Sequence, residues 1–258
     1  MLLKLIFFIS ISLSLSLTKG ELDDFTKNLI KTGTFVLDDD IHLSKRQIEM
    51  MKNEHHSASG RVKRVVSSLG YHQWTEFPIK YRIFKPVNET LIKQAIANIE
   101  KETCLTFEEN KKLPKKKTNG LYFVNDGYCY GELGRSVHGK VQNVSITEEC
   151  QEMGTILHEI GHALGMQHEH NRVDRDQHIY IDWDKIGQAN QTHFYIENNT
   201  FTLNIKYDYG SAMHYVRRAG REKNGTETIY ANITAYKYTM GQRNSFSFLD
   251  WKTLNRFY

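Results

Sequence analysis

The chain has 258 residues, of which 40% are hydrophobic and 25% charged, a composition typical of a globular protein with one well-buried domain and a short appendage. Its 34 basic and 30 acidic side chains leave a formal net charge of +4. This charge is spread over the whole length and is too small to indicate a nucleic-acid partner.

The first twenty residues have the pattern of a secretory signal peptide. Residues 1–4 carry one positive charge, residues 5–17 are almost entirely apolar or serine, and residues 18–20 end the run. The alternative is a membrane anchor, but about 13 apolar residues are too few to span a bilayer. We therefore expect residues 1–20 to be a signal peptide and the mature protein to be secreted and extracellular, without a membrane span.

Residues 21–64 form a candidate pro-segment. They contain an acidic cluster at 38–40, one modest helical stretch near 45–52 and no cysteine. The segment ends in Arg61-Val62-Lys63-Arg64, just before the first dense apolar pattern. A basic run is usually a solvated loop, but in a secreted precursor this position favours cleavage after Arg64 by a processing protease.

The remaining chain, residues 65–258, is the expected catalytic domain. Residues 78–84 alternate apolar and charged side chains, which predicts a strand, and Asn88 can cap a helix over 89–102 because apolar residues recur there at helical spacing. From Arg172 onward few regular patterns occur. The other predicted elements are strands at 105–107, 121–124 and 142–146, an exposed lysine-rich loop at 111–117, and helices at 151–164 and 248–257.

The strongest motif is His158-Glu159-Ile160-Gly161-His162 on the predicted helix 151–164. Positions four apart lie on one helix face, so both histidines can point a ring nitrogen at one zinc ion. Glu159 follows the first ligand. Its carboxylate can therefore take a proton from the water that zinc activates for attack on a peptide carbonyl.

Gly165 and His168 extend this motif at spacings of three residues. A bare His-Glu-x-x-His also arises by chance on a surface helix with two solvated histidines. A catalytic zinc, however, needs a third protein ligand and an open position, and a straight helix would carry His168 away from the metal. Glycine can adopt the left-handed conformation that ends a helix and turns the chain back. The extended pattern therefore favours a catalytic zinc site.

Two segments resemble a known family. The zinc motif from His158 to His168 is that of the metzincins, and Glu169 with the residues up to Asp176 closely resembles the astacin continuation. Ser211-Ala212-Met213-His214-Tyr215 resembles the methionine turn with the astacin tyrosine. The resemblance covers residues 65–258. It implies an α+β fold of two lobes, with a twisted N-terminal sheet, a zinc-binding helix and an irregular C-terminal lobe that holds the methionine turn.

The resemblance also implies roles for individual residues. Met213 would form an apolar floor beneath the three imidazoles. Tyr215 would be a further zinc ligand at rest that swings aside and donates its phenol to the developing oxyanion, although it could also be one more core tyrosine. Glu169 would pair with the new amino terminus, which cleavage after Arg64 places at Val65. The implied cofactor is one zinc ion.

Latency in the resembled family comes from a pro-segment aspartate that takes the water's place on zinc. The family pattern there resembles Phe-x-Gly-Asp-Ile, and this chain has Leu37-Asp38-Asp39-Asp40-Ile41. Alignment on the Asp-Ile pair makes Asp40 the expected lock and Asp38 a second candidate. Leu37 and Asp39 depart from the pattern, and the alternative is an acidic surface turn.

The three cysteines also fit the resemblance. It implies a disulfide between Cys129 and Cys150, while Cys104 would pair with a cysteine just after the terminal Asn-x-x-Tyr. The chain stops at Tyr258, so we expect a fragment or a truncated form without that bridge. Six Asn-x-Ser/Thr triplets are candidate glycan sites, and the sequence leaves open which are used. Their asparagines are Asn88, Asn143, Asn190, Asn198, Asn224 and Asn232.

These patterns predict a secreted zinc endopeptidase, made as a latent zymogen, that acts on extracellular proteins across a cleft with residues 142–146 as its rim. An inactive homologue that serves as a binding protein is one alternative, and a matrix-degrading or venom-type metzincin is another. The complete ligand set with Glu159 disfavours the first, while Glu169 and Tyr215 disfavour the second. Val173 and Val216 replace the usual proline and glycine and leave loop and cleft details open. The substrate and the oligomeric state are open as well.

Overall fold

The computed structural model describes residues 34–38, 40–44, 64–67, 73–116, 118–136, 139–197 and 200–258. The expected signal peptide at 1–20, the helical stretch near 45–52 and residues 61–63 of the basic run lie outside these ranges. In the part of the chain that the structure describes, no helix combines the length and the apolar character needed to cross a membrane.

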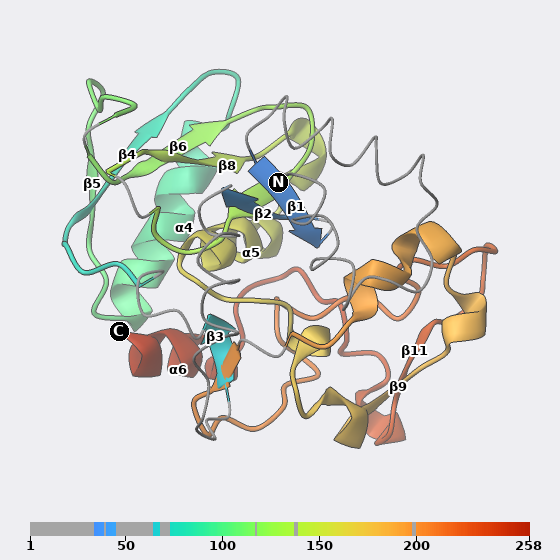
Figure 1. Ribbon diagram of the computed structural model, residues 1–258. Coiled ribbons are helices and arrows are strands. Elements are labelled where there is room, and N and C mark those ends of the chain that lie inside the picture. Colours follow the sequence, from blue (N-terminus) through green and yellow to red (C-terminus); the bar gives the residue numbers. More distant parts are fainter. Residues whose placement is uncertain are drawn as a thin grey trace, which may run out of the picture.

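A seven-stranded mixed sheet forms the N-terminal lobe (Figure 1). Neighbouring strands are parallel except in the pairs β1–β2 and β7–β8. In spatial order the strands are β1 (Thr34–Asp38), β2 (Ile41–Ser44), β7 (Tyr130–Glu132), β8 (Gln142–Ser145), β6 (Leu121–Val124), β4 (Ile79–Ile83) and β5 (Phe107–Glu109).

Two helices, α4 (Glu89–Glu102) and α5 (Met153–Ala163), lie together beneath this sheet (Figure 1). The Asn88 side chain caps α4 by accepting hydrogen bonds from the backbone N–H groups of Thr90 and Leu91 at 3.1 and 3.2 Å. Buried isoleucines of both helices share one apolar core with the sheet. Burial of these side chains is the main stabilising term for the lobe and fixes α5 under the strands.

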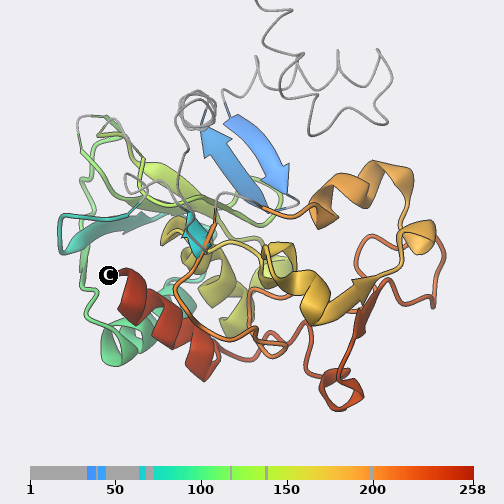
Figure 2. The ribbon, with the colours of Figure 1, turned by 60° about the horizontal axis from the view of Figure 1, so that its bottom comes forward.

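The C-terminal lobe is irregular, as predicted from the sequence, and consists mainly of short 3-10 turns. A second core, rich in tyrosine and isoleucine, lies inside it. Its elements are η3 (Glu169–Asn171), η4 (Arg175–Gln177), β9 (Ile179–Ile181), η5 (Trp183–Lys185), η6 (Gln188–Phe194), β11 (Ile229–Ala231) and η7 (Thr234–Tyr236). The short pair of β3 (Arg64–Ser67) and β10 (Thr200–Thr202) lies near the last helix, α6 (Phe248–Phe257) (Figures 1 and 2).

Most predicted elements are confirmed, with two errors. The strand expected at 105–107 forms at Phe107–Glu109, where it pairs with β4. The strand at 142–146 exists as β8, but it lies inside the sheet between β7 and β6 and cannot be the rim of the cleft. Strand β7 was not predicted because its three residues are all buried and show no alternation.

The β1–β2 hairpin, in the expected pro-segment, was also not predicted. It extends the sheet beyond β7: the backbone N–H groups of Gly131 and Leu133 donate to the carbonyls of Asp40 and His42, both at 3.0 Å. On its other side, β1 contacts η6 of the C-terminal lobe. Figure 2 shows the hairpin standing between the sheet and the η6 region. The hairpin therefore bridges the two lobes.

The cysteines and glycan candidates have defined places. A disulfide joins Cys129 and Cys150, as the family resemblance implied, and Cys104 is free and exposed. Asn88, Asn224 and Asn232 are exposed, Asn143 and Asn190 are half-buried, and Asn198 lies outside the described residues.

Candidate zinc site

Helix α5 carries the first two histidines. His158 and His162 lie one turn apart on its buried face, and their side chains are almost fully inaccessible to solvent. Strand β7 packs directly on this helix because Gly131 has no side chain: a Cβ atom there would come within 2.4 Å of the Glu159 carbonyl oxygen. Gly131 therefore lets the sheet edge approach the motif.

Gly165 brings the third histidine back to the same point. Its φ angle is +94°, a conformation that glycine adopts without strain. The backbone N–H of Met166 donates to the Gly161 carbonyl at 2.9 Å and closes the end of the helix. The chain then reverses, and the His168 ring lies 4.8 Å from the His162 ring, centroid to centroid.

The three histidine Nε2 atoms fit a zinc ion. The His158 Nε2 atom lies 3.1 Å from that of His162 and 3.3 Å from that of His168. Two nitrogens bound to one tetrahedral zinc at 2.0–2.1 Å are separated by about 3.3 Å. Both distances are therefore those expected for zinc ligands, and the ligand atoms of all three histidines lie within 4.8 Å of one another.

Hydrogen bonds on the far side of two rings explain this convergence. The Nδ1 atoms of His158 and His162 donate to the carbonyls of Ala212 and Met166 at 2.7 and 2.8 Å. Because a carbonyl only accepts, the proton of each neutral ring is on Nδ1 and the Nε2 atom presents a bare lone pair. Burial lowers the pKa of His158 to about 3 and also lowers that of His162, so both rings are neutral. Two lone pairs at hydrogen-bonding distance need a cation between them.

Asp250, at the start of α6, holds the turn that orients His158. Its carboxylate accepts from the Ser211 hydroxyl at 2.6 Å and from the Ala212 N–H at 2.8 Å. The adjacent Met213 is buried, and its sulfur would lie 3.0 Å from a Cβ atom at Gly161, so it packs against the zinc helix. Sequence reasoning missed this role of Asp250, because Ser211 and Ala212 lie 39 and 38 residues away, and its local partner Ser247 indicates only the cap of α6.

Asp250→Asn is expected to weaken zinc binding by about 10- to 100-fold, because the amide cannot accept both contacts that hold the Ser211–Ala212 turn. Competition with a chromophoric chelator on the full chain measures this. Ser247→Ala is the matched control: it removes the cap of the same helix but leaves Ala212 bonded to Asp250. Parent-like zinc affinity in Asp250→Asn, or an equal loss in Ser247→Ala, would contradict the assigned role.

Asp40 of the hairpin faces all three histidines. One carboxylate oxygen lies 3.0 Å from His158 Nε2, and the other lies 3.0 Å from His168 Nε2 and 3.5 Å from His162 Nε2. These four side chains are a group that could hold a metal ion. Asp40 thus stands in the place of a fourth ligand, where a catalytic zinc keeps an open position.

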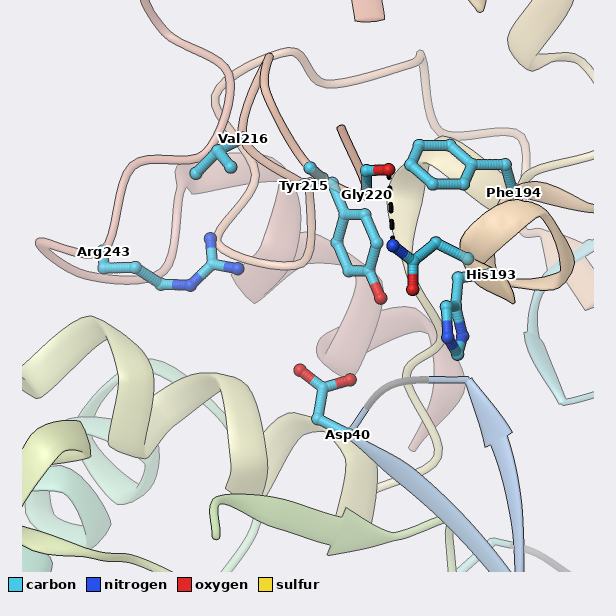
Figure 3. Close-up of a pocket in the computed structure, with 9 residues that line it drawn as sticks. Asp40, His193, Phe194, Tyr215, Val216, Gly220 and Arg243 are labelled. Atoms are coloured by element: carbon cyan, nitrogen blue, oxygen red, sulfur yellow. Dashed lines mark hydrogen bonds between the residues drawn. The ribbon is translucent and has the colours of Figure 1, made fainter. Parts of the chain in front are cut away.

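Tyr215 projects into a cavity of about 330 Å³ next to this group. Figure 3 shows its phenol and the Asp40 carboxylate both pointing into that space. Val216, half-exposed, lies against Gly241, where a Cβ atom would come within 2.4 Å of it. The replacement of the usual glycine therefore puts an aliphatic side chain on the wall. The other lining residues are Asn190, His193, Phe194, Ala219, Gly220 and Arg243.

Glu169 directly follows the third histidine and is buried in η3. Its carboxylate accepts from Arg172 at 2.9 Å and from the Asp208 N–H at 2.7 Å. Burial raises the pKa of Glu169 to about 8, while Arg172 acts in the opposite direction. Val65, the expected new amino terminus, lies within β3, where it pairs with Phe201.

Similarity to known proteins agrees with this site. The model of the astacin family of peptidases matches residues 67–258. The chain is 36% identical over 233 residues to the zinc metalloproteinase nas-36 of Caenorhabditis briggsae, a match that covers 88% of this chain and 37% of that protein. It is 31% identical over 245 residues to the zinc metalloproteinase dpy-31 of Haemonchus contortus. That match covers 92% of this chain and 44% of that protein.

A solved structure supports the same assignment. High choriolytic enzyme 1, a hatching enzyme zinc-protease from the medaka Oryzias latipes, superposes with a TM-score of 0.65 at 32% identity and covers 73% of this chain and 94% of that one. Fold and site thus define the class of zinc metallopeptidases. Within it, the chain belongs to the astacin family, which excludes the other metzincin alternatives. It spans less than half the length of nas-36 and dpy-31.

Proposed function

We propose that the chain is a secreted zinc endopeptidase, made as a latent zymogen, that hydrolyses internal peptide bonds of extracellular proteins. The observation that supports it best is the convergence of three imidazole Nε2 atoms at zinc-ligand spacing beside Glu159. Membership of a family of zinc metalloproteinases supports it further.

The chemistry assigns one proton path to Glu159. Bound zinc would lower the pKa of a water molecule and polarise the substrate carbonyl. Glu159 accepts a proton from that water as the water oxygen bonds to the carbonyl carbon. It then gives the proton to the departing nitrogen as the C–N bond breaks, which leaves a carboxylic acid and an amine. Tyr215 donates a hydrogen bond to the oxyanion that forms on the carbonyl oxygen.

Strand β7 is the proposed edge strand to which an extended substrate binds. It is the edge of the sheet once the hairpin is set aside, and its Gly131 N–H is the donor that the hairpin now uses. An extended peptide can add to such an edge by main-chain hydrogen bonds, which favours internal bonds over chain ends. The rim that sequence reasoning put at β8 is thus proposed at β7.

Latency would follow from the hairpin. Its Asp40 carboxylate occupies the place of the attacking water, and His42 stacks on Tyr130 of β7 at 3.9 Å with an interplanar angle of 12°. Cleavage after Arg64 separates the hairpin from the catalytic domain. The released Val65 amino group would then pair with Glu169. Burial disfavours the charged form of this carboxylate, and a positively charged partner would stabilise it.

The test is hydrolysis of a denatured protein by the zinc-loaded full chain after proteolytic cleavage at Arg64. We expect new internal termini, mapped by mass spectrometry, and no products from the uncleaved chain. His162→Ala, which leaves two imidazoles, should lose both zinc and activity, as metal analysis of the purified variant will show. A cleaved, zinc-loaded parent that hydrolyses nothing, or only trims chain ends, would refute the proposal.

A further inference from the structure

His170 lies directly beneath Tyr215. It belongs to η3, two residues after the third histidine, and its side chain is completely buried. The two rings are stacked face to face, with centroids 3.9 Å apart and an interplanar angle of 25°. The His168 ring meets Tyr215 at 4.6 Å and a steeper angle of 55°. The broad face of the tyrosine therefore rests on His170.

A hydrogen bond fixes the plane of the His170 ring. Its Nε2 atom donates to the carbonyl oxygen of His193, on the η6 wall of the cavity, at 3.0 Å. Rotation of the ring about its side-chain bonds would break this contact in a buried place, where a lost hydrogen bond is costly. The surface on which Tyr215 rests is thus rigid.

Phe194 completes the enclosure of the tyrosine. Its ring stands edge-on to Tyr215 at 5.9 Å and to His170 at 5.6 Å. Aromatic rings in these stacked and edge-on arrangements attract each other beyond simple area burial. A displacement of Tyr215 parallel to the His170 ring keeps their stack, whereas tilting the phenol away from that ring breaks it.

We propose that His170 is a positioning residue for Tyr215. Its ring is the stacking surface along which the phenol moves between its resting position and the position where it donates to the oxyanion. This inference rests on the proposed function of the site. It predicts that His170 acts on turnover through Tyr215 and not through substrate binding.

His170→Leu, in the zinc-loaded and cleaved full chain, is expected to lower kcat about tenfold, because the favourable stack of the His170 and Tyr215 rings is lost. KM should stay within about twofold of the parent. In a Tyr215→Phe background the same substitution should change kcat by less than about twofold, because the hydroxyl group that the His170 ring positions is already absent. Equal losses in the two backgrounds would overturn the inference and make His170 an ordinary core residue.

Two variants keep the test decisive if His170→Leu fails to fold. His170→Phe keeps the ring face and should return kcat to within about threefold of the parent, whereas His170→Gln keeps a donor without a ring and should behave like leucine. A phenylalanine variant as slow as glutamine would overturn the proposal. His178→Leu is the matched control: His178 stacks on Tyr207 at 4.6 Å outside the cavity, so its loss should leave kcat unchanged.

The outcomes separate this inference from the proposed function. A cleaved parent without activity refutes the function itself. If the cleaved parent is active and Tyr215→Phe leaves its kcat unchanged, Tyr215 has no role in turnover, and neither has His170 as its positioning residue. An active parent that needs Tyr215 but shows additive losses refutes His170 alone.

Discussion

Glu159→Ala is expected to retain zinc and to lower kcat/KM on a protein substrate by roughly 10³- to 10⁴-fold, the largest loss expected from a variant that keeps the metal. The reason is that Glu159 is the only group assigned to carry the proton from water to the leaving nitrogen, while the three imidazoles keep their places. Initial rates and metal content of the cleaved full chain measure the two quantities separately.

Two further variants sharpen this test. Glu159→Gln preserves shape and should be nearly as slow as alanine, because the amide cannot accept the proton. Glu152→Ala is the matched control: Glu152 is exposed and immediately precedes α5, and its side chain makes no capping hydrogen bond, so the activity of this variant should equal that of the parent. If Glu159→Ala were as active as the parent with a protein substrate, the proposed mechanism would be wrong.

The proposed set of three histidine ligands was predictable because each of its constraints is local. A four-residue spacing puts His158 and His162 on one helical face, and a glycine at 165 allows the reversal that His168 needs. Such information is contained in eleven consecutive residues. Helices α4 and α6 were predictable for the same reason, since their capping residues and apolar spacing lie within each segment.

The parts that sequence reasoning missed depend on distant partners. Strand β7 has only three residues, and its position on α5 depends on contact between Gly131 and the Glu159 backbone. Arg175 gives order to the irregular lobe through hydrogen bonds to the carbonyls of His170 and Phe194. Neither the residue type nor the neighbouring sequence indicates these partners, of which His170 lies five residues from Arg175 and Phe194 lies 19, because such contacts leave no periodic pattern.

Asp40 shows how a family resemblance and tertiary structure complement each other. Alignment singled it out, but its neighbours Leu37 and Asp39 departed from the family pattern, and no strand was predicted around it. The structure supplies the hairpin turn that puts Asp40 between β1 and β2 and within 3.0 Å of two histidines. Pairing of β2 with β7 therefore places the Asp40 carboxylate beside the histidines.

The substitution Asp40→Ala, made in a chain whose Arg64→Ala change blocks cleavage, is expected to raise the hydrolysis of a short peptide at least about tenfold over the uncleaved parent. Removing the carboxylate opens the position beside the three histidines, where an intramolecular ligand otherwise competes at an effective concentration in the millimolar range or above. A short peptide is the right substrate, because β2 still covers the β7 edge and β1 still contacts η6, so a protein chain stays excluded.

Asp38→Ala in the same uncleavable chain is the control, since Asp38 belongs to β1 and is the second candidate from the sequence. It should remain as latent as the uncleaved parent. Zinc content should be equal in all three proteins, because His158, His162 and His168 are unchanged. If Asp40→Ala is no more active than the uncleaved parent, Asp40 is not the lock. If Asp38→Ala alone restores turnover, the lock is Asp38, and alignment on the Asp-Ile pair chose the wrong carboxylate.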